Sequence, residues 1–593
     1  MADDDFTPEQ LHVVGLPPQA RALVVAPAGT GKTHVLAGRL ASLLEHHGLD
    51  PGDEVLVLSF SRAAVAELRR RVASLGGDAA YVGSATFDSF ASRVLASEFP
   101  DSDWLSKGYD ERVEAAVERI TSDPLPGMLR LARHILVDEI QDLAGRRAAL
   151  VLTLINRLDC GFTVFGDPAQ AIYGYQSVAG DLSTAELFDA IRAADPVFNE
   201  LTLSEDFRST VPAKEEIAEI GKALRCPDPH PQVIADEIRS VSLRLPFVEL
   251  AAARRMLTKP GRGPSAILSR TNGEALRLSR HLFDLGVNHS LQRRGEDKAV
   301  GSWLARAVAN VSTSKVSAAG LRDALPPESD EDFSRLSLQM RRLDPSRGDG
   351  FDLARIANRI RSGDVPEEVN EGAATDVVVS TIHRAKGLEF DRVYLCEWEA
   401  RPDDDVDEEN RLRYVAMTRA KRELFQVRRV DRSGLTVDPR TGRWLRRGFG
   451  SSRWRVHELE VLGSDADRTY PARSAEMDER QTQEYILTSV SPGDSVELLR
   501  SDGQEPGPQF VIAHAGRIVG ATAPEFAEIL VAIFGEHRLP TALRDLRVEL
   551  VDTVAGDARA AVRGGLGAHG LWARVRPAGL ASVGFSSTVG EET

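Results

Sequence analysis

The chain has 593 residues, of which 42% are hydrophobic and 27% charged, and its 89 acidic against 73 basic side chains give a formal net charge of −16. This composition is ordinary for a folded globular protein, and the length exceeds what one hydrophobic core can organise, so we expect roughly three to five domains. The acidic balance excludes a protein that coats nucleic acid by overall positive charge, although a narrow basic track is compatible with it.

The sequence carries no signal for export or for membrane insertion. The first five residues, Met-Ala-Asp-Asp-Asp, lack the basic start of a secretory signal, and no apolar run approaches about 18 residues. The cysteines Cys160, Cys226 and Cys396 form no CxxC pair, which argues against a zinc ribbon or a four-cysteine iron–sulfur cluster. We therefore expect a reduced, cytoplasmic protein without a membrane partner.

A glycine-rich segment follows the apolar run Leu23-Val24-Val25, and helical spacing of leucines begins directly after it. The segment consists of Ala26, Pro27, Ala28, Gly29, Thr30, Gly31, Lys32 and Thr33. Strand, glycine-rich loop and helix in this order are typical of a phosphate-binding loop, in which backbone N–H groups and the helix N-terminus face the phosphates. We expect Lys32 to contact the β- and γ-phosphates and the Thr33 hydroxyl to bind Mg²⁺. Ala26 stands where a glycine is usual, and a negative φ would tolerate it.

Short β-branched runs alternate with helical segments over roughly the first 90 residues, which indicates a parallel sheet. After a helical, polar stretch at 91–130, two more buried-type strands end at acidic residues. Ile135-Leu136-Val137 precedes Asp138 and Glu139, and residues 162–165 precede Gly166 and Asp167. Carboxylates at the C-terminal edge of a parallel sheet lie beside the phosphate loop, where open α/β sheets bind ligands. Considered alone, the two adjacent carboxylates could simply cap a helix.

The remainder of the chain shows three further patterns. A second α/β pattern begins near residue 201 and resumes at 377–379 and 393–395, around a helical, charged segment at 291–372 that resembles an insertion. Residues 463–482 are polar, as in a linker. From about residue 485, short alternating segments with Pro and Gly turns predict a small β-rich module.

Between Lys421 and Arg455 the charge balance inverts, and Trp444, Phe449 and Trp454 lie among the arginines. Basic residues interleaved with aromatic ones suit contacts with a nucleic-acid backbone and its bases. A strand pair with solvated arginines, or one that docks on the acidic surface of this same protein, explains the pattern equally well.

Taken together, the motifs from about Phe6 to Lys421 resemble those of the UvrD/Rep/PcrA-type superfamily 1 DNA helicases, and they occur in the family order. Residues 6–10 resemble the Q motif, which implies that Gln10 reads adenine. Residues 58–64, with Phe60, resemble motif Ia, and residues 85–90, with Thr86, resemble motif Ib. Both resemblances imply contacts with single-stranded DNA.

The acidic strand ends match two more motifs of this family. Residues 137–142 resemble its Walker B motif, which implies that Asp138 binds Mg²⁺ and Glu139 positions the attacking water; phosphoryl transfer requires both functions. Residues 166–175 resemble motif III, which implies that Gln170 senses the γ-phosphate and Tyr175 stacks on a DNA base. For Tyr175 alone, a buried core tyrosine is the alternative.

Three motifs of the family lie in the second α/β segment. In residues 203–210, similar to motif IV, Phe207 takes the place of the adenine-stacking tyrosine, and Arg208 is implied to reach the γ-phosphate. Residues 381–390 resemble motif V, which implies a DNA contact at His383 and a contact between Glu389 and the nucleotide sugar. Residues 414–420 resemble motif VI, with Arg419 as the arginine finger. Two arginines of one lobe that face a phosphate held by the other would let ATP close a cleft and hydrolysis reopen it.

The resemblance implies an α/β fold with two RecA-like P-loop domains, in which parallel sheets are flanked by helices, two small and mainly helical insertions, and a C-terminal β-rich domain. The expected parts are RecA-like domain 1A at 1–90 and 130–200, a reduced 1B insertion at 91–129, RecA-like domain 2A at 201–290 and 373–460, a reduced 2B insertion at 291–372, a linker at 461–484 and the small accessory domain at 485–593.

The sequence also departs from the family pattern. Both insertions are shorter than in the large helicases, so ATP-driven movement on single strands is better supported than processive unwinding. His34 stands where several relatives have a nucleotide-contacting arginine. No lysine follows Lys421, which argues against the Glu-x-Lys nuclease of some relatives. The tail loosely resembles a HIRAN-like barrel that binds DNA ends, and a protein-docking barrel fits it equally well.

We therefore expect an ATP- and Mg²⁺-dependent helicase or translocase that acts on single-stranded DNA or on junctions of single- and double-stranded DNA, with the 3′→5′ polarity that the family implies. The alternative is a DNA-stimulated ATPase subunit that switches or recruits a partner, such as a nuclease or a defence complex, with little unwinding of its own. Intact Lys32, Asp138, Glu139 and Arg419 argue against a scaffold that binds nucleotide without hydrolysis.

Overall fold

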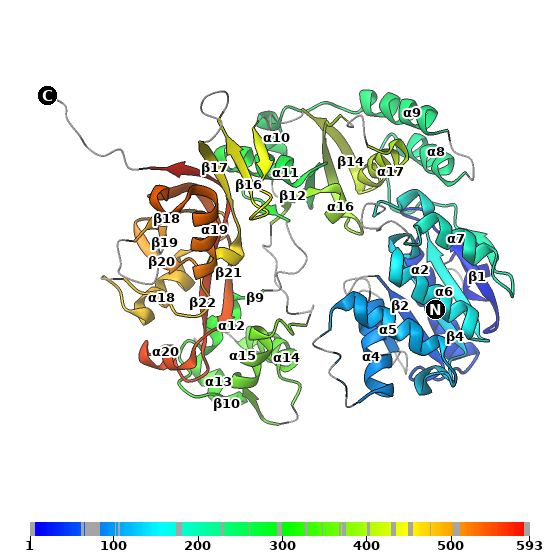
Figure 1. Cartoon of the computed structure of the whole chain (residues 1–593), viewed down its shortest axis with the longest axis horizontal. Helices are drawn as coiled ribbons and strands as arrows, with labels where there is room; N and C mark the ends of the chain where they lie inside the picture. Colours follow the sequence, from blue (N-terminus) through cyan, green and yellow to red (C-terminus); the bar gives the residue numbers. More distant parts are fainter. Residues whose placement is uncertain are drawn as a thin grey trace. The chain divides into compact units, whose positions relative to one another are not determined.

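The computed structural model shows two compact units (Figure 1). It describes residues 6–60, 65, 83–100, 102, 104, 107–173, 181–226, 230–259, 261–292, 299–325, 330–346, 348–366, 369, 375–399, 404–428, 434–448, 455–474, 476–501 and 510–585. Unit 1 comprises residues 1–246, 385–395 and 399–426, and unit 2 comprises residues 247–384, 396–398 and 427–593. Within these described ranges, no helix combines the length and the apolar character needed to cross a membrane.

A parallel sheet with the strand order β3-β2-β4-β5-β1-β6 forms the centre of unit 1. Its strands are β1 (Arg21–Val25), β2 (Val55–Ser59), β3 (Gly83–Thr86), β4 (His134–Val137), β5 (Gly161–Gly166) and β6 (Asn199–Thr202). Strands β1, β2, β4 and β5 are buried along their whole length, as in a parallel sheet that helices cover on both faces. This order brings the C-terminal ends of β4, β5 and β1 next to one another, so the Walker B carboxylates, motif III and the phosphate loop share one sheet edge.

The helices of unit 1 bury one face each against this sheet or against one another. They are α1 (Pro8–Val14), α2 (Lys32–Ala41), α4 (Phe87–Glu98), α5 (Tyr109–Thr121), α6 (Gly145–Arg157), α7 (Thr184–Arg192), α8 (Lys214–Arg225), α9 (Pro231–Arg244) and α17 (Val406–Met417). Helices α4 and α5 occupy the segment expected as a reduced insertion. They bury Phe90, Val94, Val113 and Ile120 in the same core as the sheet, so this helical pair packs as part of unit 1.

A second sheet has the strand order β14-β13-β7-β12-β8. Its strands are β7 (Ser265–Ser269), β8 (Ser290–Leu291), β12 (Val377–Thr381), β13 (Phe390–Cys396) and β14 (Ala420–Val427). Strand β12 pairs in parallel with β7 on one side and with β8 on the other. Helix α11 (Asn272–Asp284) connects β7 to β8, and the short helix α16 (Ile382–Ala385) follows β12. Two parallel sheets flanked by helices confirm the predicted fold class.

The third sheet of the described chain belongs to unit 2 and has the order β15-β16-β17-β22-β21-β18-β19-β20, with β9 paired to β21. Its strands are β9 (Val300–Gly301), β15 (Leu435–Val437), β16 (Trp444–Arg447), β17 (Val456–Val461), β18 (Ser495–Arg500), β19 (Phe510–His514), β20 (Arg517–Ala521), β21 (Ala542–Ala555) and β22 (Leu571–Gly584). Strands β15 and β16 precede the expected boundary at residue 460 and β17 crosses it, yet all three belong to the C-terminal sheet, in which β17 pairs with β22. The reason is a shared apolar core, in which Leu445 and Leu459 pack with residues of the C-terminal strands such as Leu543.

Helices and a two-stranded antiparallel sheet complete unit 2. The elements are α10 (Leu250–Leu257), α12 (Ser302–Val308), α13 (Ala318–Ala324), α14 (Asp330–Leu343), α15 (Leu353–Arg361), α18 (Glu479–Ser489), α19 (Pro524–Phe534), α20 (Ala558–Arg563) and the antiparallel strands β10 (Lys315–Ser317) and β11 (Gly350–Asp352). Helices α12 to α15 lie in the segment expected as the second insertion. Their core includes Leu304, Met340 and Ile356 together with Ala555 and Leu571 at the ends of the two longest strands, so this segment and the C-terminal sheet form one packed body (Figure 1).

Candidate nucleotide-binding site

The phosphate loop has the left-handed backbone that its glycines permit. Gly29 and Gly31 have φ values of 86° and 77°, and α2 begins directly after Gly31. A Cβ atom on Gly29 would lie 1.9 Å from Oδ1 of Asp206, so this position requires glycine for space as well as for φ. The backbone N–H of Ala26 donates to the Gly166 carbonyl at 3.0 Å. Ala26 is not one of the described residues with a positive φ, so alanine is tolerated where a glycine is usual.

Lys32 points from the start of α2 towards the carboxylates that follow β4. Its Nζ lies 3.3 Å from Oδ1 of Asp138, and it also forms an ion pair with Glu139. Burial by itself would lower the pKa of Lys32, but the two carboxylates outweigh it and raise that pKa. Burial likewise opposes ionisation of Glu139, yet the Lys32 ammonium holds the pKa of Glu139 at about 2. Lys32 is therefore cationic and Glu139 anionic at neutral pH.

Glu139 has an unusual backbone. Its φ of 54° is in the left-handed region, which costs a non-glycine residue roughly 1–3 kcal/mol and is typical of functional sites. The Glu139 N–H donates to Oδ1 of Asp138 at 2.9 Å, and the Gln141 side-chain amide donates to the Glu139 carboxylate. The amide oxygen of Gln141 in turn accepts the N–H of Asp167 at 3.1 Å, which connects the Walker B segment to motif III.

Gln170 and Arg419, which are 249 residues apart in sequence, lie in contact. Nη2 of Arg419 donates to Oε1 of Gln170 at 3.2 Å, and both side chains are buried. Nε of Arg419 also donates to the Val415 carbonyl at 3.0 Å, which holds the guanidinium against the C-terminal end of α17. Burial lowers the pKa of Arg419 to about 10, and the nearby Arg208 guanidinium contributes to this shift.

Arg208 reaches the phosphate loop through the backbone of its own segment. The N–H of Phe207 donates to the Gly29 carbonyl at 3.0 Å, while the Phe207 ring is 56% exposed. The Arg208 guanidinium forms an ion pair with Glu389, whose other oxygen lies 3.0 Å from Nζ of Lys421. Glu389, expected to contact the nucleotide sugar, thus holds two cations beside the loop.

These segments enclose a cavity of about 390 Å³. The residues that line it come from the phosphate loop, the motif IV segment, α8 and the end of α17, and include Pro27, Ala28, Thr30, Asp206, Arg208, Ile217, Ala218, Arg225, Tyr414, Met417 and Thr418. The lining combines the polar phosphate loop and Arg208 with the apolar side chains of Ile217, Ala218 and Met417. Such a lining suits a ligand that has both phosphates and an apolar ring.

Comparison with known proteins finds similarity to UvrD-like helicases. The chain matches the UvrD/REP helicase N-terminal domain over residues 6–125 and 127–181, and the UvrD-like helicase C-terminal domain over residues 339–428. It is 27% identical over 246 residues to the ATP-dependent DNA helicase UvrD1 of Mycobacterium tuberculosis, which covers 40% of this chain and 29% of that protein. It is 42% identical over 74 residues to the ATP-dependent DNA helicase PcrA of Staphylococcus aureus, which covers 12% and 10% of the two chains.

The two domain matches and these relatives support a UvrD/Rep/PcrA-type superfamily 1 helicase. The predicted resemblance is therefore confirmed. The matched segments span less than a third of either relative's own length. Among solved structures, the crystal structure of Pif1 helicase from Candida albicans aligns with 72% of this chain and 96% of that chain, at 14% identity and a TM-score of 0.35.

Gln10, the Q-motif residue of this helicase family, uses both ends of its amide within the protein. Its Oε1 accepts the N–H of Thr7 at 3.1 Å, and its Nε2 donates to the Thr30 carbonyl at 3.0 Å. The side chain is almost fully buried and joins the N-terminus of α1 to the phosphate loop. One N–H and one lone pair of the amide are left by these two bonds for a base. His34, one of the departures from the helicase pattern, stacks on Phe6 with ring centroids 4.4 Å apart.

The residues expected to bind Mg²⁺ provide hard oxygen donors beside the phosphate loop. Thr33 lies in the first turn of α2, and Asp138 directly follows β4 at the same sheet edge. Among the described residues, no group of three or more His, Cys, Asp or Glu side chains forms a cation cage. Mg²⁺ that accompanies a nucleotide needs only one or two carboxylates, because phosphates and waters supply the other ligands. Thr33 and Asp138 fit that role.

The expected DNA-contact residues have different surroundings. Phe60 stacks with Tyr173 at 5.9 Å between ring centroids, and Nζ of Lys386 lies 4.9 Å from the centre of the same Tyr173 ring. Thr86 caps α4, because its hydroxyl accepts the N–H of Ser89 at 3.3 Å. His383 lies in α16, in unit 2. Tyr175 lies outside the described residues.

Sequence reasoning missed a contact between two helicase motifs. Lys386 of motif V forms an ion pair with Asp142 of Walker B, and its Nζ donates to the Gln170 carbonyl at 2.6 Å. Burial raises the pKa of Asp142 to about 6, although Lys386 opposes this shift. Both residues lie inside the motifs that identified the family, but nothing in either motif indicates its partner.

The basic segment between Lys421 and Arg455 is largely ion-paired where the structure describes it. Arg443, directly before β16, pairs with Asp465. On β16, Nε of Arg446 lies 2.8 Å from Glu458, and Nη2 of Arg447 lies 3.2 Å from Asp438. These contacts favour docking on acidic groups of the same protein over a nucleic-acid track for the β16 arginines. Five other basic and aromatic members of the segment lie outside the described residues, namely Arg429, Arg432, Phe449, Arg453 and Trp454.

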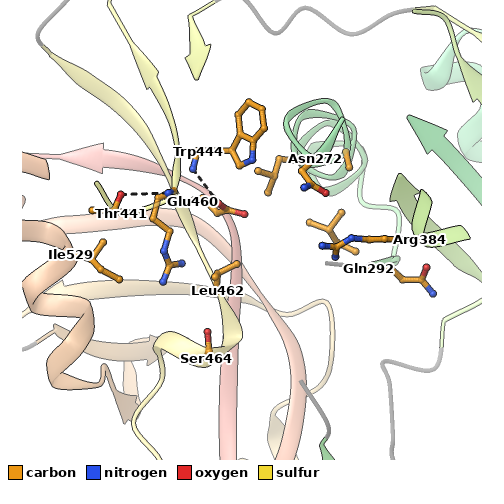
Figure 2. Close-up of a pocket in the computed structure, with 14 residues that line it drawn as sticks. Asn272, Gln292, Arg384, Thr441, Trp444, Glu460, Leu462, Ser464 and Ile529 are labelled. Atoms are coloured by element: carbon orange, nitrogen blue, oxygen red, sulfur yellow. Dashed lines mark hydrogen bonds between the residues drawn. The ribbon is translucent and has the colours of Figure 1, made fainter. Parts of the chain in front are cut away.

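A second, smaller pocket lies within unit 2, lined by residues of α11, the short helix α16, β16 and β17 (Figure 2). Its volume is about 230 Å³, and its lining includes Asn272, Arg384 and Trp444. The backbone N–H of Trp444 donates to Glu460 at 3.1 Å (Figure 2). The indole packs so closely on α11 that a Cβ on Gly273 would lie 2.7 Å from Cζ3 of Trp444. Arg384, which lines this polar pocket, belongs to the motif V segment and directly follows His383 in the chain.

Proposed function

We propose that this chain is an ATP-driven motor that moves on single-stranded DNA with 3′→5′ polarity and separates strands at junctions with duplex DNA. The observation that carries the proposal is the group of functional side chains around one sheet edge and one cavity. Lys32, Asp138 and Glu139 form a charged cluster at the phosphate loop, and Arg419 contacts Gln170 beside it. Similarity to a helicase family supports the assignment to DNA.

In the proposed reaction, the phosphates of ATP lie along the N–H groups of the phosphate loop and the N-terminus of α2. Lys32 then exchanges its carboxylate partners for the β- and γ-phosphates. Thr33 and Asp138 would hold Mg²⁺, which neutralises phosphate charge when it is bound. Glu139, ionised and held in a left-handed backbone, orients water for in-line attack on the γ-phosphate.

The arginines stabilise the charge that develops on the transferred phosphoryl group. Arg419 is held beside Gln170 by its bonds to that residue and to the Val415 carbonyl. Arg208 lines the cavity next to the phosphate loop and would exchange Glu389 for phosphate oxygens. Because Lys386 contacts the Gln170 carbonyl and lies over the Tyr173 ring beside Phe60, we infer that this lysine connects the DNA-contact segment to the γ-phosphate sensor.

An ATPase assay with and without single-stranded DNA tests this proposal. We expect the wild-type chain to hydrolyse ATP faster when single-stranded DNA is present, and Lys32→Ala to abolish hydrolysis. Glu139→Gln should still bind ATP and DNA but turn over at least about a hundredfold more slowly, because the amide cannot accept the proton or orient water as a carboxylate does. Hydrolysis by Glu139→Gln at the wild-type rate would show that another group positions the water.

A DNA-stimulated ATPase that switches a protein partner, with little strand separation, is the second candidate. The observation that favours it is the packing of helices α12 to α15 on the C-terminal sheet. An insertion that shares its core with the accessory sheet presents a single body to a partner. The two candidates share every residue of the nucleotide site, so only strand separation distinguishes them.

A further inference from the structure

Arg225, the last residue of α8, lies outside every motif of the helicase resemblance, yet it lines the proposed nucleotide cavity and forms a two-pronged ion pair with Asp167. Its Nε donates to Oδ1 of Asp167 at 2.7 Å, and its Nη2 donates to Oδ2 of the same carboxylate at 3.1 Å. Nη2 also donates to the hydroxyl of Tyr414 at 2.9 Å. The Asp167 side chain is 1% exposed and that of Arg225 is 14% exposed, so water screens this two-pronged contact little.

Asp167 in turn orients Gln170, the proposed γ-phosphate sensor. Its Oδ1 accepts the N–H of Ala169 at 3.1 Å, and its Oδ2 accepts Nε2 of Gln170 at 2.8 Å. The amide nitrogen of Gln170 is therefore directed towards Asp167. The amide oxygen is consequently directed towards Nη2 of Arg419, at 3.2 Å. A rotated Gln170 amide would present N–H groups to the Arg419 guanidinium, and this pairing would be lost.

We propose that Arg225 is a positioning residue for ATP hydrolysis, which anchors Asp167 so that the Gln170 amide oxygen faces Arg419. Arg225 acts through Asp167 and Gln170 and exchanges no proton with the substrate. Arg225 also contacts Tyr414 on α17, the helix that ends two residues before Arg419, and this contact holds α17 against the network. The inference rests on the proposed ATPase function of the same site.

The test compares kcat and KM for ATP, at saturating single-stranded DNA, in the wild type, Arg225→Met and Arg225→Lys. We expect Arg225→Met to lower kcat about tenfold or more while KM changes less than about twofold, because alignment is lost and ground-state binding is kept. Arg225→Lys keeps the positive charge but cannot donate two parallel N–H groups to Asp167, so its kcat should lie between those of Arg225→Met and the wild type. Arg244→Met is the matched control, because Arg244 forms an exposed ion pair with Glu216 at 3.0 Å on the neighbouring helix. The control should leave kcat unchanged.

A double-mutant cycle separates positioning from a general effect on stability. If Arg225 acts through Gln170, then Arg225→Met should lower kcat less than about twofold in a Gln170→Ala background. Full additivity of the two kcat effects would overturn the proposal, and so would a wild-type kcat in Arg225→Met. If Arg225→Met does not fold, the same cycle is measured with Arg225→Lys, and the same two outcomes for kcat apply. A wild-type chain without ATPase activity would instead refute the proposed function itself.

Discussion

At the scale of single residues, Gly29 shows how a missing Cβ positions the motif IV segment. The Asp206 carboxylate occupies the space next to its Cα, and Phe207 donates to its carbonyl. The glycine therefore serves two purposes, since it permits the curled phosphate loop and also lets a distant segment approach it. Gly48 has a comparable φ of 65°, but a Cβ there would meet no heavy atom within 4 Å.

The first prediction compares alanine at these two glycines. Gly48→Ala should lower the free energy of unfolding by roughly 1 kcal/mol, the usual cost of a left-handed alanine. Gly29→Ala should cost more and also weaken binding of a non-hydrolysable ATP analogue at least about tenfold, because the Asp206 segment must move. Thermal unfolding and fluorescence titration with the analogue measure the two effects. Equal nucleotide affinity in the two variants would contradict the steric role of Gly29.

Asp142 offers a second test at this scale, because burial raises its pKa to about 6 from an ordinary value of 3.8. Between these two values, the folded state binds more protons at this group than the unfolded state does. The free energy of unfolding contributed by Asp142 therefore falls as the pH rises from about 4 to 6, and it is constant above that window.

The matching prediction concerns the difference in melting temperature between the wild type and Asp142→Asn. The melting temperature of the wild type should fall relative to that of Asp142→Asn as the pH rises from about 4 to 6, because the asparagine does not titrate. The difference should become constant above about pH 7. Thermal unfolding of both proteins across this range measures it. A difference that does not depend on pH would show that the carboxyl group of Asp142 titrates alike in the folded and unfolded states.

At the scale of elements, strand β16 shows that a basic sequence need not be a basic surface. Arg443 is buried, and its guanidinium pairs with Asp465, whose Oδ2 also accepts the N–H of Leu462 at 2.8 Å. The pair ties β16 to the turn after β17. Arg440, three residues earlier, is 61% exposed and lies 3.6 Å from Asp438.

We predict that Arg443→Gln lowers the free energy of unfolding by roughly 3 kcal/mol, since it leaves Asp465 buried without its cation. Arg440→Gln should change it by less than about 0.5 kcal/mol, as is usual for an exposed pair. Denaturant unfolding of both variants provides the measurement. The salt dependence of single-stranded DNA binding should be the same in Arg440→Gln and in the wild type; a reduced slope would return this segment to the nucleic-acid interpretation.

At the scale of the whole molecule, the described chain divides into two compact units. Unit 1 contains the complete proposed nucleotide site, including both arginines. Unit 2 contains His383, the smaller polar pocket, and the body in which α12 to α15 pack on the C-terminal sheet. A helicase and an ATPase switch would use this architecture differently, because only the helicase must convert hydrolysis into movement along DNA.

The last prediction therefore concerns strand displacement. With ATP, the wild-type chain should displace the strand of a duplex with a 3′ single-stranded tail and leave a duplex with a 5′ tail intact, and Lys32→Ala should displace neither. A gel or fluorescence assay run beside the ATPase measurement gives both rates. Hydrolysis stimulated by DNA without displacement from either substrate would favour the switch, and displacement from the 5′ tail alone would reverse the proposed polarity.

By itself, the sequence determined the fold class, the family and the segments that meet at the nucleotide site, because each motif is contiguous and its spacing specifies a local geometry. The turn from β1 into α2 at Lys32 and the carboxylates after β4 are of this kind. The tertiary structure alone decided the partners that lie far apart in the chain. Arg225 meets Asp167 across 58 residues, and Lys386 meets Asp142 across 244. Such pairs depend on how the helices pack on the sheets. A buried charge must be paired, and the packing decides which opposite charge lies close enough to pair with it.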